Sequence, residues 1–305
     1  MIVDTHTRIW HSPTQLGPDA IDNLARPVDV AGERVRVLPR ADGASHLISS
    51  EPVDYCFVLG FKSLYLKAEI PNRWIADYCA EHSEKMVGFA GVDPTDPDAI
   101  DKISLIAREP SLKGMVICPA AQDIHPCDTQ AMEVYEAAAR QKLPIIMDIG
   151  PNLCPGVKLQ YARPDLLDEV ARSIPDLHIV ITQMGYPWVD EALAILQNHK
   201  NVSSNIGALL RRPWIAYDAL RRAWEMGVMD KLLFGSDFPF MSATEAVEAV
   251  FNINQLVANT GLPKIPRTAL EQLVERDAIG VLQIDIPRAK ILANLPRHRR
   301  VGRAG

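Results

Sequence analysis

The chain has 305 residues, of which 48% are hydrophobic and 23% charged, and its formal net charge is −6. This composition is typical of a globular protein with a sizeable core, and the length allows one large α/β barrel or two medium domains. The negative charge, together with the lack of a basic stripe with interleaved aromatic residues, argues against a nucleic-acid partner. The chain begins directly with a predicted strand, and no apolar run approaches the ~18 residues of a membrane span. The five cysteines include no CxxC motif and favour reduced thiols, so we expect a cytoplasmic protein without a membrane partner.

Short apolar runs alternate with helix-length amphipathic stretches along the chain. The runs that we predict to be strands are residues 2–6, 55–60, 87–94, 112–119, 144–150, 178–185, 202–206 and 232–239. The stretches that we predict to be helices are 72–82, 98–108, 128–141, 164–174, 189–198, 214–226, 243–259 and 266–282. A strand–helix unit repeated eight times predicts an α/β fold, a single (β/α)8 TIM barrel with additional C-terminal helices. The working side chains of such a barrel lie at the carboxyl ends of its strands.

Two segments lie outside this alternation. Residues 11–50 are rich in Pro, Gly, Asp and Arg and predict an extended loop between the first two strands, which would serve as a lid, a binding loop or an oligomer contact. We expect the barrel domain to span residues 1–286. Residues 287–305 form a basic tail, either a solvated end or an arm that packs on a neighbouring subunit.

Several stretches of the sequence occur in the order expected for one known family. They are Asp4-Thr5-His6, Val87 to Pro94, Leu112-Lys113-Gly114 with Pro119 to Gln122, Met184 to Trp188, Asn201-Val202 and Phe234 to Pro239. On these stretches the chain resembles the amidohydrolase-related (amidohydrolase 2) family of TIM-barrel hydrolases and decarboxylases, over nearly its whole length. The resemblance implies a site at the mouth of the barrel and, in ordinary members of the family, a divalent metal ion.

The metal ligands that this resemblance implies are mostly replaced. Family members typically carry an HxH pair after the first strand, a His at each of the fifth and sixth strands, and an Asp at the eighth. The matching positions here are His6, Arg8, Asp148, Gln183 and Asp237, so that only His6 and Asp237 are retained. Arginine has no lone pair to donate and is always charged, so Arg8 cannot bind a metal and would repel one. Gln183 offers only a neutral carbonyl oxygen.

We therefore expect an ion-pair network centred on Arg8 in place of a metal. The guanidinium would lie between Asp148 and Asp237, because a pair of buried carboxylates needs a cation nearby. No cofactor is then expected. The alternative is Zn²⁺ or Mn²⁺ held by the reduced set of His6, Asp148 and Asp237.

Further candidates follow the fifth, sixth and seventh strands. The arginines Arg163, Arg211 and Arg212 would suit a carboxylate or phosphate on the substrate, although arginines in loops are often simply solvated. Trp10 and Trp188 would wall a ligand, or else pack the loops themselves. These residues predict a small, anionic substrate.

The leading expectation is a divergent hydrolase acting on a small organic acid, lactone, ester or amide, with little or no metal dependence. Asp237 would act as the base, His6 as its hydrogen-bonding partner and Arg8 as the positive centre. The first alternative is a catalytically inactive barrel that binds a ligand or serves as a partner subunit. The second is a metal-dependent hydrolase or decarboxylase that uses the reduced ligand set. Because relatives often form oligomers, the resemblance also implies a homo-oligomer, most simply a dimer.

Overall fold

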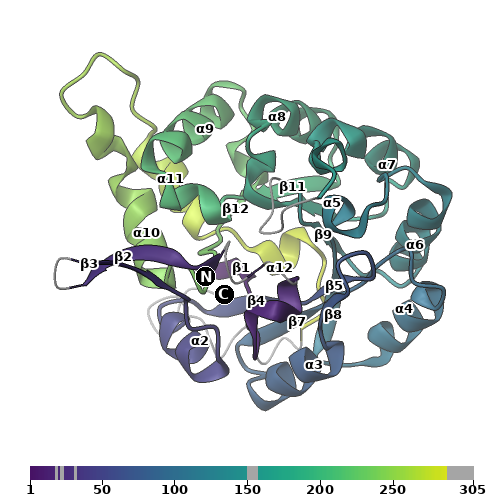
Figure 1. Ribbon diagram of the computed structural model, residues 1–305. Coiled ribbons are helices and arrows are strands. Elements are labelled where there is room, and N and C mark those ends of the chain that lie inside the picture. The colour runs from purple at the N-terminus through teal and green to yellow at the C-terminus, as the bar shows by residue number, and fades with distance from the viewer. Residues whose placement is uncertain (18–19, 21–23, 31–32, 150–156, 287–305) are drawn as a thin grey trace, which may run out of the picture.

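The central feature of the fold is a barrel of eight parallel strands with helices around it (Figure 1). The computed structural model describes residues 1–17, 20, 24–30, 33–149 and 157–286. The strands follow one another in the order β1-β4-β7-β8-β9-β10-β11-β12. Their bounds are Val3–Thr7 (β1), Tyr55–Leu59 (β4), Met86–Gly91 (β7), Leu112–Ile117 (β8), Ile145–Met147 (β9), Ile179–Ile181 (β10), Val202–Asn205 (β11) and Leu232–Leu233 (β12). The predicted TIM barrel is thus confirmed.

Hydrogen bonds between β1 and the chain after β12 close the barrel. The backbone N–H of Thr5 donates to the carbonyl of Phe234, and the N–H of Asp237 donates to the carbonyl of His6. Thr7 and Phe238 form an isolated parallel bridge beyond them. Closure therefore places the ends of the first and last strands, with His6 and Asp237, directly beside each other.

The helices fill the connections between the strands at the places that the sequence predicts. Those before β12 are α3 (Asn72–Glu81), α4 (Ala99–Arg108), α5 (Pro119–Gln122), α6 (Thr129–Arg140), α7 (Leu167–Ser173), α8 (Val189–Asn198) and α9 (Pro213–Glu225). After β12 come α10 (Ala243–Asn252), α11 (Arg267–Val274) and α12 (Ala278–Val281), so the last predicted helix is two shorter ones. Short 3-10 turns are η1 (Pro13–Leu16), η2 (Leu159–Ala162), η3 (Pro164–Leu166), η4 (Thr182–Gly185), η5 (Gly207–Arg211), η6 (Met229–Lys231) and η7 (Ile253–Val257).

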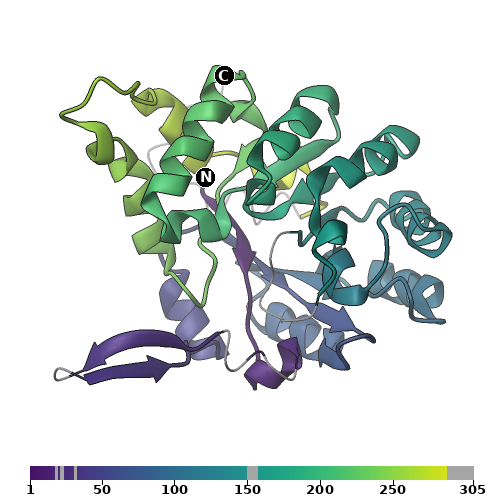
Figure 2. The ribbon, with the colours of Figure 1, turned by 45° about the horizontal axis from the view of Figure 1, so that its top comes forward.

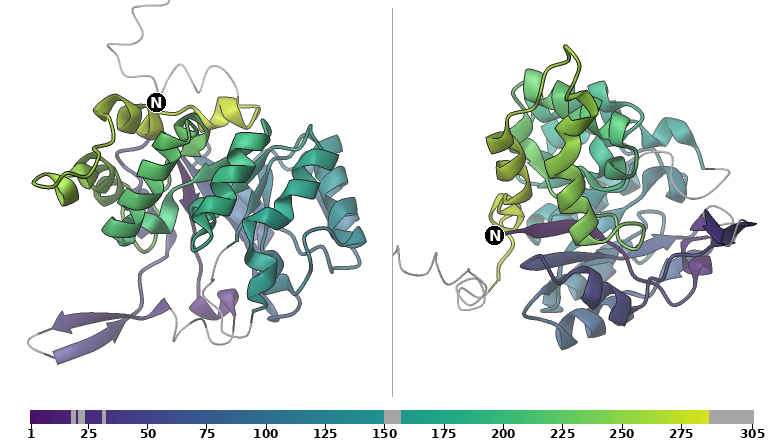
Figure 3. Two further views of the ribbon diagram at one scale, coloured as in Figure 1. Left: turned by 90° about the horizontal axis from the view of Figure 1, so that it is seen from above. Right: turned by 90° about the vertical axis from the view of Figure 1, so that its left-hand side faces the viewer.

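The segment between the first two barrel strands is more regular than the predicted loop. It contains an antiparallel hairpin, β2 (Arg26–Val30) and β3 (Glu33–Val37), and a helix, α2 (Gly43–Ser49). The hairpin projects from the end of the barrel where β1 finishes (Figures 2 and 3). A second small hairpin, β5 (Phe61–Ser63) with β6 (Ala68–Ile70), follows β4. The prediction of an irregular loop is therefore wrong for the backbone that is described.

The predicted strands are longer than the observed ones at their carboxyl ends. The eighth was predicted to reach residue 239, but β12 ends at Leu233. Asp237 has a φ of 69°, which takes it out of extended conformation. Residues after β10 behave similarly, since Gln183 and Met184 have φ values of 54° and 49°. These turns bring polar side chains over the barrel mouth instead of continuing the sheet.

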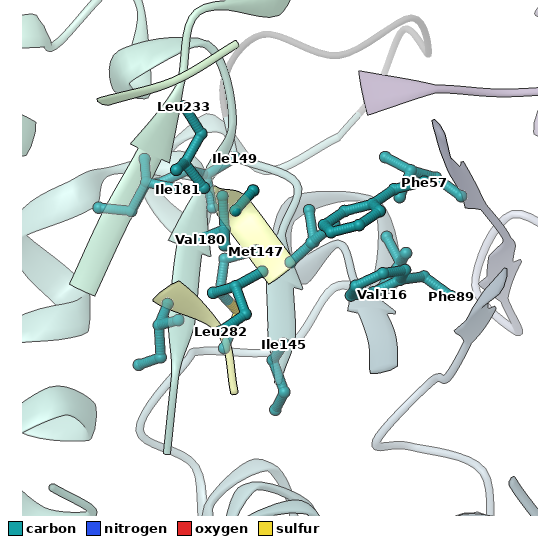
Figure 4. Packing of buried hydrophobic residues seen from close by; sticks show 14 of the residues in the cluster. Phe57, Phe89, Val116, Ile145, Met147, Ile149, Val180, Ile181, Leu233 and Leu282 are labelled. Carbon is teal, nitrogen blue, oxygen red and sulfur yellow. The ribbon is translucent and has the colours of Figure 1, made fainter. Parts of the chain in front are cut away.

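Apolar side chains fill the barrel and the layer between strands and helices. Figure 4 shows Phe57, Phe89, Val116, Met147, Val180 and Leu233 from neighbouring strands gathered around Leu282, which follows α12. Gly114 permits the close packing here, because a Cβ atom at this position would lie 2.3 Å from the Phe89 ring. In the described part of the chain, no helix is both long and apolar enough to cross a membrane.

Candidate active site

His6 lies at the end of β1 with both ring nitrogens near polar partners. Its Nδ1 is 3.3 Å from Oδ1 of Asn205, the last residue of β11, and its Nε2 is 3.8 Å from Oδ1 of Asp237. The side chain is buried, with 4% of the residue exposed. Gly207 permits this placement, because a Cβ atom there would lie 2.5 Å from His6 Nδ1. The imidazole is thus held between the seventh and eighth strands.

Arg8 and Asp148 form a buried ion pair across the barrel mouth. Arg8 Nη2 donates to Asp148 Oδ2 at 3.0 Å through this single contact, which is not bidentate. The hydroxyl of Thr182 donates to Asp148 Oδ1 at 3.1 Å, and the thiol of Cys118 lies 3.7 Å from Oδ2. The guanidinium carbon of Arg8 also lies 5.9 Å from the centre of the Phe61 ring. Charge, hydroxyl and ring together fix the pair in place.

The pair shifts the pKa of both members toward their charged forms. Burial by itself would raise the pKa of Asp148, but the charge of Arg8 and the hydrogen bonds outweigh it and hold this pKa below its usual value. Burial likewise opposes the charge on Arg8, and the attraction of Asp148 nevertheless keeps the pKa of Arg8 above its usual value. Asp237 adds a weaker attraction to Arg8. Arg8 therefore serves mainly Asp148, not both carboxylates equally.

Asp237 is held from both sides by cationic or polar groups. Its Oδ1 faces His6, and its Oδ2 lies 2.9 Å from Nε of Arg211. The Arg211 N–H is not aligned with that oxygen, so the contact is an ion pair without a well-formed hydrogen bond. The Arg211 guanidinium carbon also lies 4.6 Å from the centre of the Phe240 ring. Arg211 therefore covers one oxygen of the carboxylate.

A second buried carboxylate, Asp4, lies two residues before His6 on the same strand. Its Oδ1 accepts hydrogen bonds from the backbone N–H of His6 at 3.1 Å and of Ser236 at 2.9 Å. Burial raises the pKa of Asp4 to about 6, against the lowering effect of these hydrogen bonds. Asp4 thus links the first strand to the chain after the last one.

The residues present do not fit the metal centre that the sequence resemblance implies. Among the residues that the structure describes, no group of three or more His, Cys, Asp or Glu side chains is placed to hold an ion. His6 and Asp237 converge, but Asp148 is turned to the guanidinium of Arg8. A buried arginine next to the third candidate ligand opposes binding of a divalent cation.

Other residues that the sequence singles out lie in different settings. Arg163 is paired with Asp165 and Glu191, outside the cluster around His6. Arg212 lies over the Tyr186 ring, at 5.4 Å from its centre.

The tryptophans and Gln183 also differ from what the sequence indicates. Trp10 is buried, with its ring 6.4 Å from that of Phe240, and Trp188 lines a groove beside α8 and α9. Gln183 acts through its backbone N–H, which donates to Asn205 Oδ1 at 3.0 Å. Of the three candidate arginines, only Arg211 contacts Asp237.

Sequence reasoning missed Asn205, Thr182, Phe240 and Asp4. The signal for Asn205 and Thr182 is their position immediately at the carboxyl ends of the seventh and sixth strands, where polar residues face the barrel mouth. Cys154, a candidate nucleophile in the sequence, and the basic tail at 287–305 lie outside the described residues.

Comparison with known proteins agrees with this geometry. The family model described as amidohydrolase, of the type amidohydrolase 2, matches residues 3–278. The chain belongs to the amidohydrolase 2 family. No curated protein matches it.

Several solved structures share the fold at low sequence identity. An uncharacterised TIM-barrel protein from Bordetella bronchiseptica is 18% identical, with a TM-score of 0.68 over 92% of this chain and 98% of that one. A probable 2-pyrone-4,6-dicarboxylic acid hydrolase from Acinetobacter baumannii, with citric acid bound, is 12% identical, with a TM-score of 0.59 over 93% and 99% of the two chains. A dihydroxybenzoic acid decarboxylase from Polaromonas, with bound manganese and 2-nitroresorcinol, is 14% identical, with a TM-score of 0.64 over 96% and 98%. Such identities establish a common fold.

Proposed function

We propose that the protein is a hydrolase that cleaves a small organic-acid lactone, ester or amide without a catalytic metal. The observation that carries this proposal is the pair of His6 Nε2 and Asp237 Oδ1, which face each other at 3.8 Å beside two guanidinium groups. The pair supplies groups able to accept a proton, and the arginines supply positive charge. These are the requirements for water activation and for stabilisation of an oxyanion.

In the proposed reaction, a water molecule held by Asp237 and His6 attacks the carbonyl carbon of the substrate. Its proton passes to Asp237 as the new C–O bond forms. The bond from the carbonyl carbon to the leaving oxygen or nitrogen then breaks, and Asp237 returns the proton to that leaving atom. Arg211 and Arg8 offset the negative charge that develops on the carbonyl oxygen.

The positive charge at the mouth also supports a preference for an anionic substrate. Arg211 is partly exposed, at 23% of its side chain, and so remains within reach of a ligand. Guanidinium groups favour carboxylates because of their paired donors. The solved relatives named for dicarboxylic acid hydrolysis and for dihydroxybenzoic acid decarboxylation support the same substrate class.

The test is a panel of lactones, esters and amides, each with and without a free carboxylate, assayed in the presence of a chelator. We expect Asp237→Asn to lower kcat/KM by about 10²- to 10⁴-fold, the usual contribution of a general base. Asp190→Asn is the matched control, because Asp190 is also paired with an arginine but lies on α8, with Arg222 as its partner. Turnover that survives Asp237→Asn would exclude Asp237 as the base.

A second candidate function is a barrel that binds an organic acid without cleaving it. The observation in its favour is the cover that Arg211 places over Asp237 Oδ2, which competes with a water molecule for the carboxylate. Calorimetric titration with the same panel would show binding without turnover in that case. The Arg211→Met variant would then lose binding.

A further inference from the structure

The side-chain amide of Asn205 has its orientation fixed by the backbone. Asn205 Oδ1 accepts a hydrogen bond from the N–H of Gln183 at 3.0 Å. A backbone N–H can only donate, so the atom that faces it must be the amide oxygen and not the nitrogen. The left-handed φ of 54° at Gln183 and 49° at Met184 belongs to the turn that directs this N–H toward the seventh strand.

This orientation decides which nitrogen of His6 carries a proton. His6 Nδ1 lies 3.3 Å from the same Asn205 oxygen, in a buried contact. The oxygen can only accept, so Nδ1 must be the donor. In a neutral imidazole the other nitrogen, Nε2, then carries the free lone pair.

The free nitrogen faces a second acceptor. Nε2 of His6 and Oδ1 of Asp237 are 3.8 Å apart, which is longer than a hydrogen bond. Two acceptors at this distance repel unless a donor lies between them. The pair is thus arranged to receive hydrogen atoms from a third group, such as a water molecule or a substrate hydroxyl.

Asn205 itself is an expensive residue for a position that needs only packing. It is fully buried, and its Nδ2 has no hydrogen-bond partner among the described residues. A buried donor without a partner destabilises the fold, and an apolar residue of similar size would avoid that cost. The amide therefore gains its purpose from its oxygen, which joins Gln183 to His6.

We propose that Asn205 is a positioning residue that holds His6 in the Nδ1-protonated form and leaves Nε2 as a proton acceptor beside Asp237. The tautomer follows from the contacts alone. Its catalytic consequence, which is that Nε2 and Asp237 together orient the attacking water, rests on the proposed function.

Nitrogen-15 NMR of histidine-labelled protein at pH 8 tests the tautomer directly, with the His6 signals assigned from their loss in His6→Gln. We expect a protonated Nδ1 and an unprotonated Nε2 in the wild type. In Asn205→Leu we expect the proton to move, wholly or in part, to Nε2. In Asn205→Asp the added carboxylate should hold both nitrogens protonated. A wild-type His6 protonated on Nε2 would overturn the proposal without any variant being needed.

The matched control is Ser204→Ala, on the same strand. The Ser204 hydroxyl is buried and donates to the carbonyl of Ile181, away from His6. We expect this variant to keep the wild-type histidine spectrum. If it changes the His6 tautomer as Asn205→Leu does, the effect is general to the strand and Asn205 has no special role.

Kinetics separates this inference from the proposed function. With an active substrate, we expect Asn205→Leu to lower kcat by about 10- to 100-fold with little change in KM, as for other residues that orient a catalytic histidine. An unchanged kcat would overturn the positioning role. If no substrate is found but His6 shows the expected tautomer, the proposed function fails while the assignment of Asn205 to His6 stands.

Discussion

At the scale of single residues, the Arg8–Asp148 pair is the feature that distinguishes this barrel mouth most. Both side chains are nearly inaccessible, at 7% and 3% exposure, so removal of one partner leaves a buried charge. We expect Arg8→Met and Asp148→Leu each to lower the free energy of unfolding by about 3–5 kcal/mol. The double variant should lose much less than the sum, because an apolar pair leaves no charge behind. Urea unfolding of the four proteins measures this coupling.

An exposed pair provides the control for that cycle. Arg73 and Asp77 contact each other at 2.8 Å on α3, with 79% and 55% of their side chains exposed. Their coupling free energy should not exceed about 0.5 kcal/mol, since solvent screens it. Equal coupling in the two cycles would mean that the buried pair makes no special contribution to stability.

Asp4 gives the protein a pH-dependent cost. Its pKa is raised from 3.8 to about 6 in the folded protein, so the folded state binds more protons than the unfolded state between these values. The free energy of unfolding therefore falls as the pH rises through this window, by up to about 3 kcal/mol for this group. Asp4→Asn keeps an oxygen for the N–H groups of His6 and Ser236 but cannot ionise.

The difference in stability between Asp4→Asn and the wild type should hence increase in favour of the variant from pH 4 to pH 7. Urea unfolding at unit steps of pH gives this difference, in which the contributions of all other titrating groups cancel. A difference that stays constant over this range would show that Asp4 titrates normally in the folded protein.

How far the site could be predicted from sequence differs between its residues. An ion pair of Arg8 with Asp148 could be anticipated, because an arginine at a family metal position needs a counterion and strands one and five both end at the mouth. Asn205 could not be singled out, because its role depends on the oxygen's partners, Gln183 and His6. Those contacts come from turns with positive φ, which no residue pattern here indicates.

At the scale of elements, the start of α10 offers a measurable local contribution. The Ser242 hydroxyl accepts from the backbone N–H of Glu245, whose carboxylate accepts from the N–H of Ser242. This capping box satisfies two donors at the helix end. We expect Ser242→Ala to lower the free energy of unfolding by about 1 kcal/mol.

The exposed Thr244, in the first turn of the same helix, is the control for this change. Thr244→Ala removes a hydroxyl without touching the cap, and the higher helix propensity of alanine should leave stability unchanged or slightly raised. Chemical denaturation of both variants compares them. Similar losses in the two would argue that the cap contributes little to stability.

Element boundaries show where the sequence pattern is sufficient. The helix at residues 189–198 was predicted with its observed limits, because its apolar spacing is regular. Asp128 was predicted to cap α6, but its carboxylate accepts from the N–H of His125 instead of from the helix. The hairpin of β2 and β3 was missed although valines alternate with charged residues at Val28, Val30, Val35 and Val37, a period that favours strands.

At the scale of the whole molecule, the barrel was predictable because its signal is repeated. Each apolar run is ambiguous alone, but eight of them separated by helix-length stretches fit few folds other than a closed parallel barrel. Closure also imposes neighbours, since β1 must meet the chain after β12. The proximity of His6 and Asp237 follows from topology, whereas the distance between their reactive atoms does not.

The last prediction concerns metal content, which depends on the whole barrel mouth. Protein expressed with added zinc and manganese and then desalted should contain far less than one equivalent of either metal by plasma mass spectrometry. The reason is the guanidinium of Arg8, which neutralises Asp148 at 3.0 Å and repels a divalent ion near His6. A chelator should accordingly leave the Tm unchanged, because no metal is bound preferentially to the folded state.

Arg8→His provides the complementary variant, since it restores an HxH pattern with His6 and removes the repulsion. We expect this variant to take up more metal than the wild type, and its Tm to rise when Zn²⁺ is added. About one equivalent of metal in the wild type would contradict the argument from Arg8. It would instead favour a metal-dependent hydrolase or decarboxylase, with His6, Asp148 and Asp237 rearranged into a ligand set.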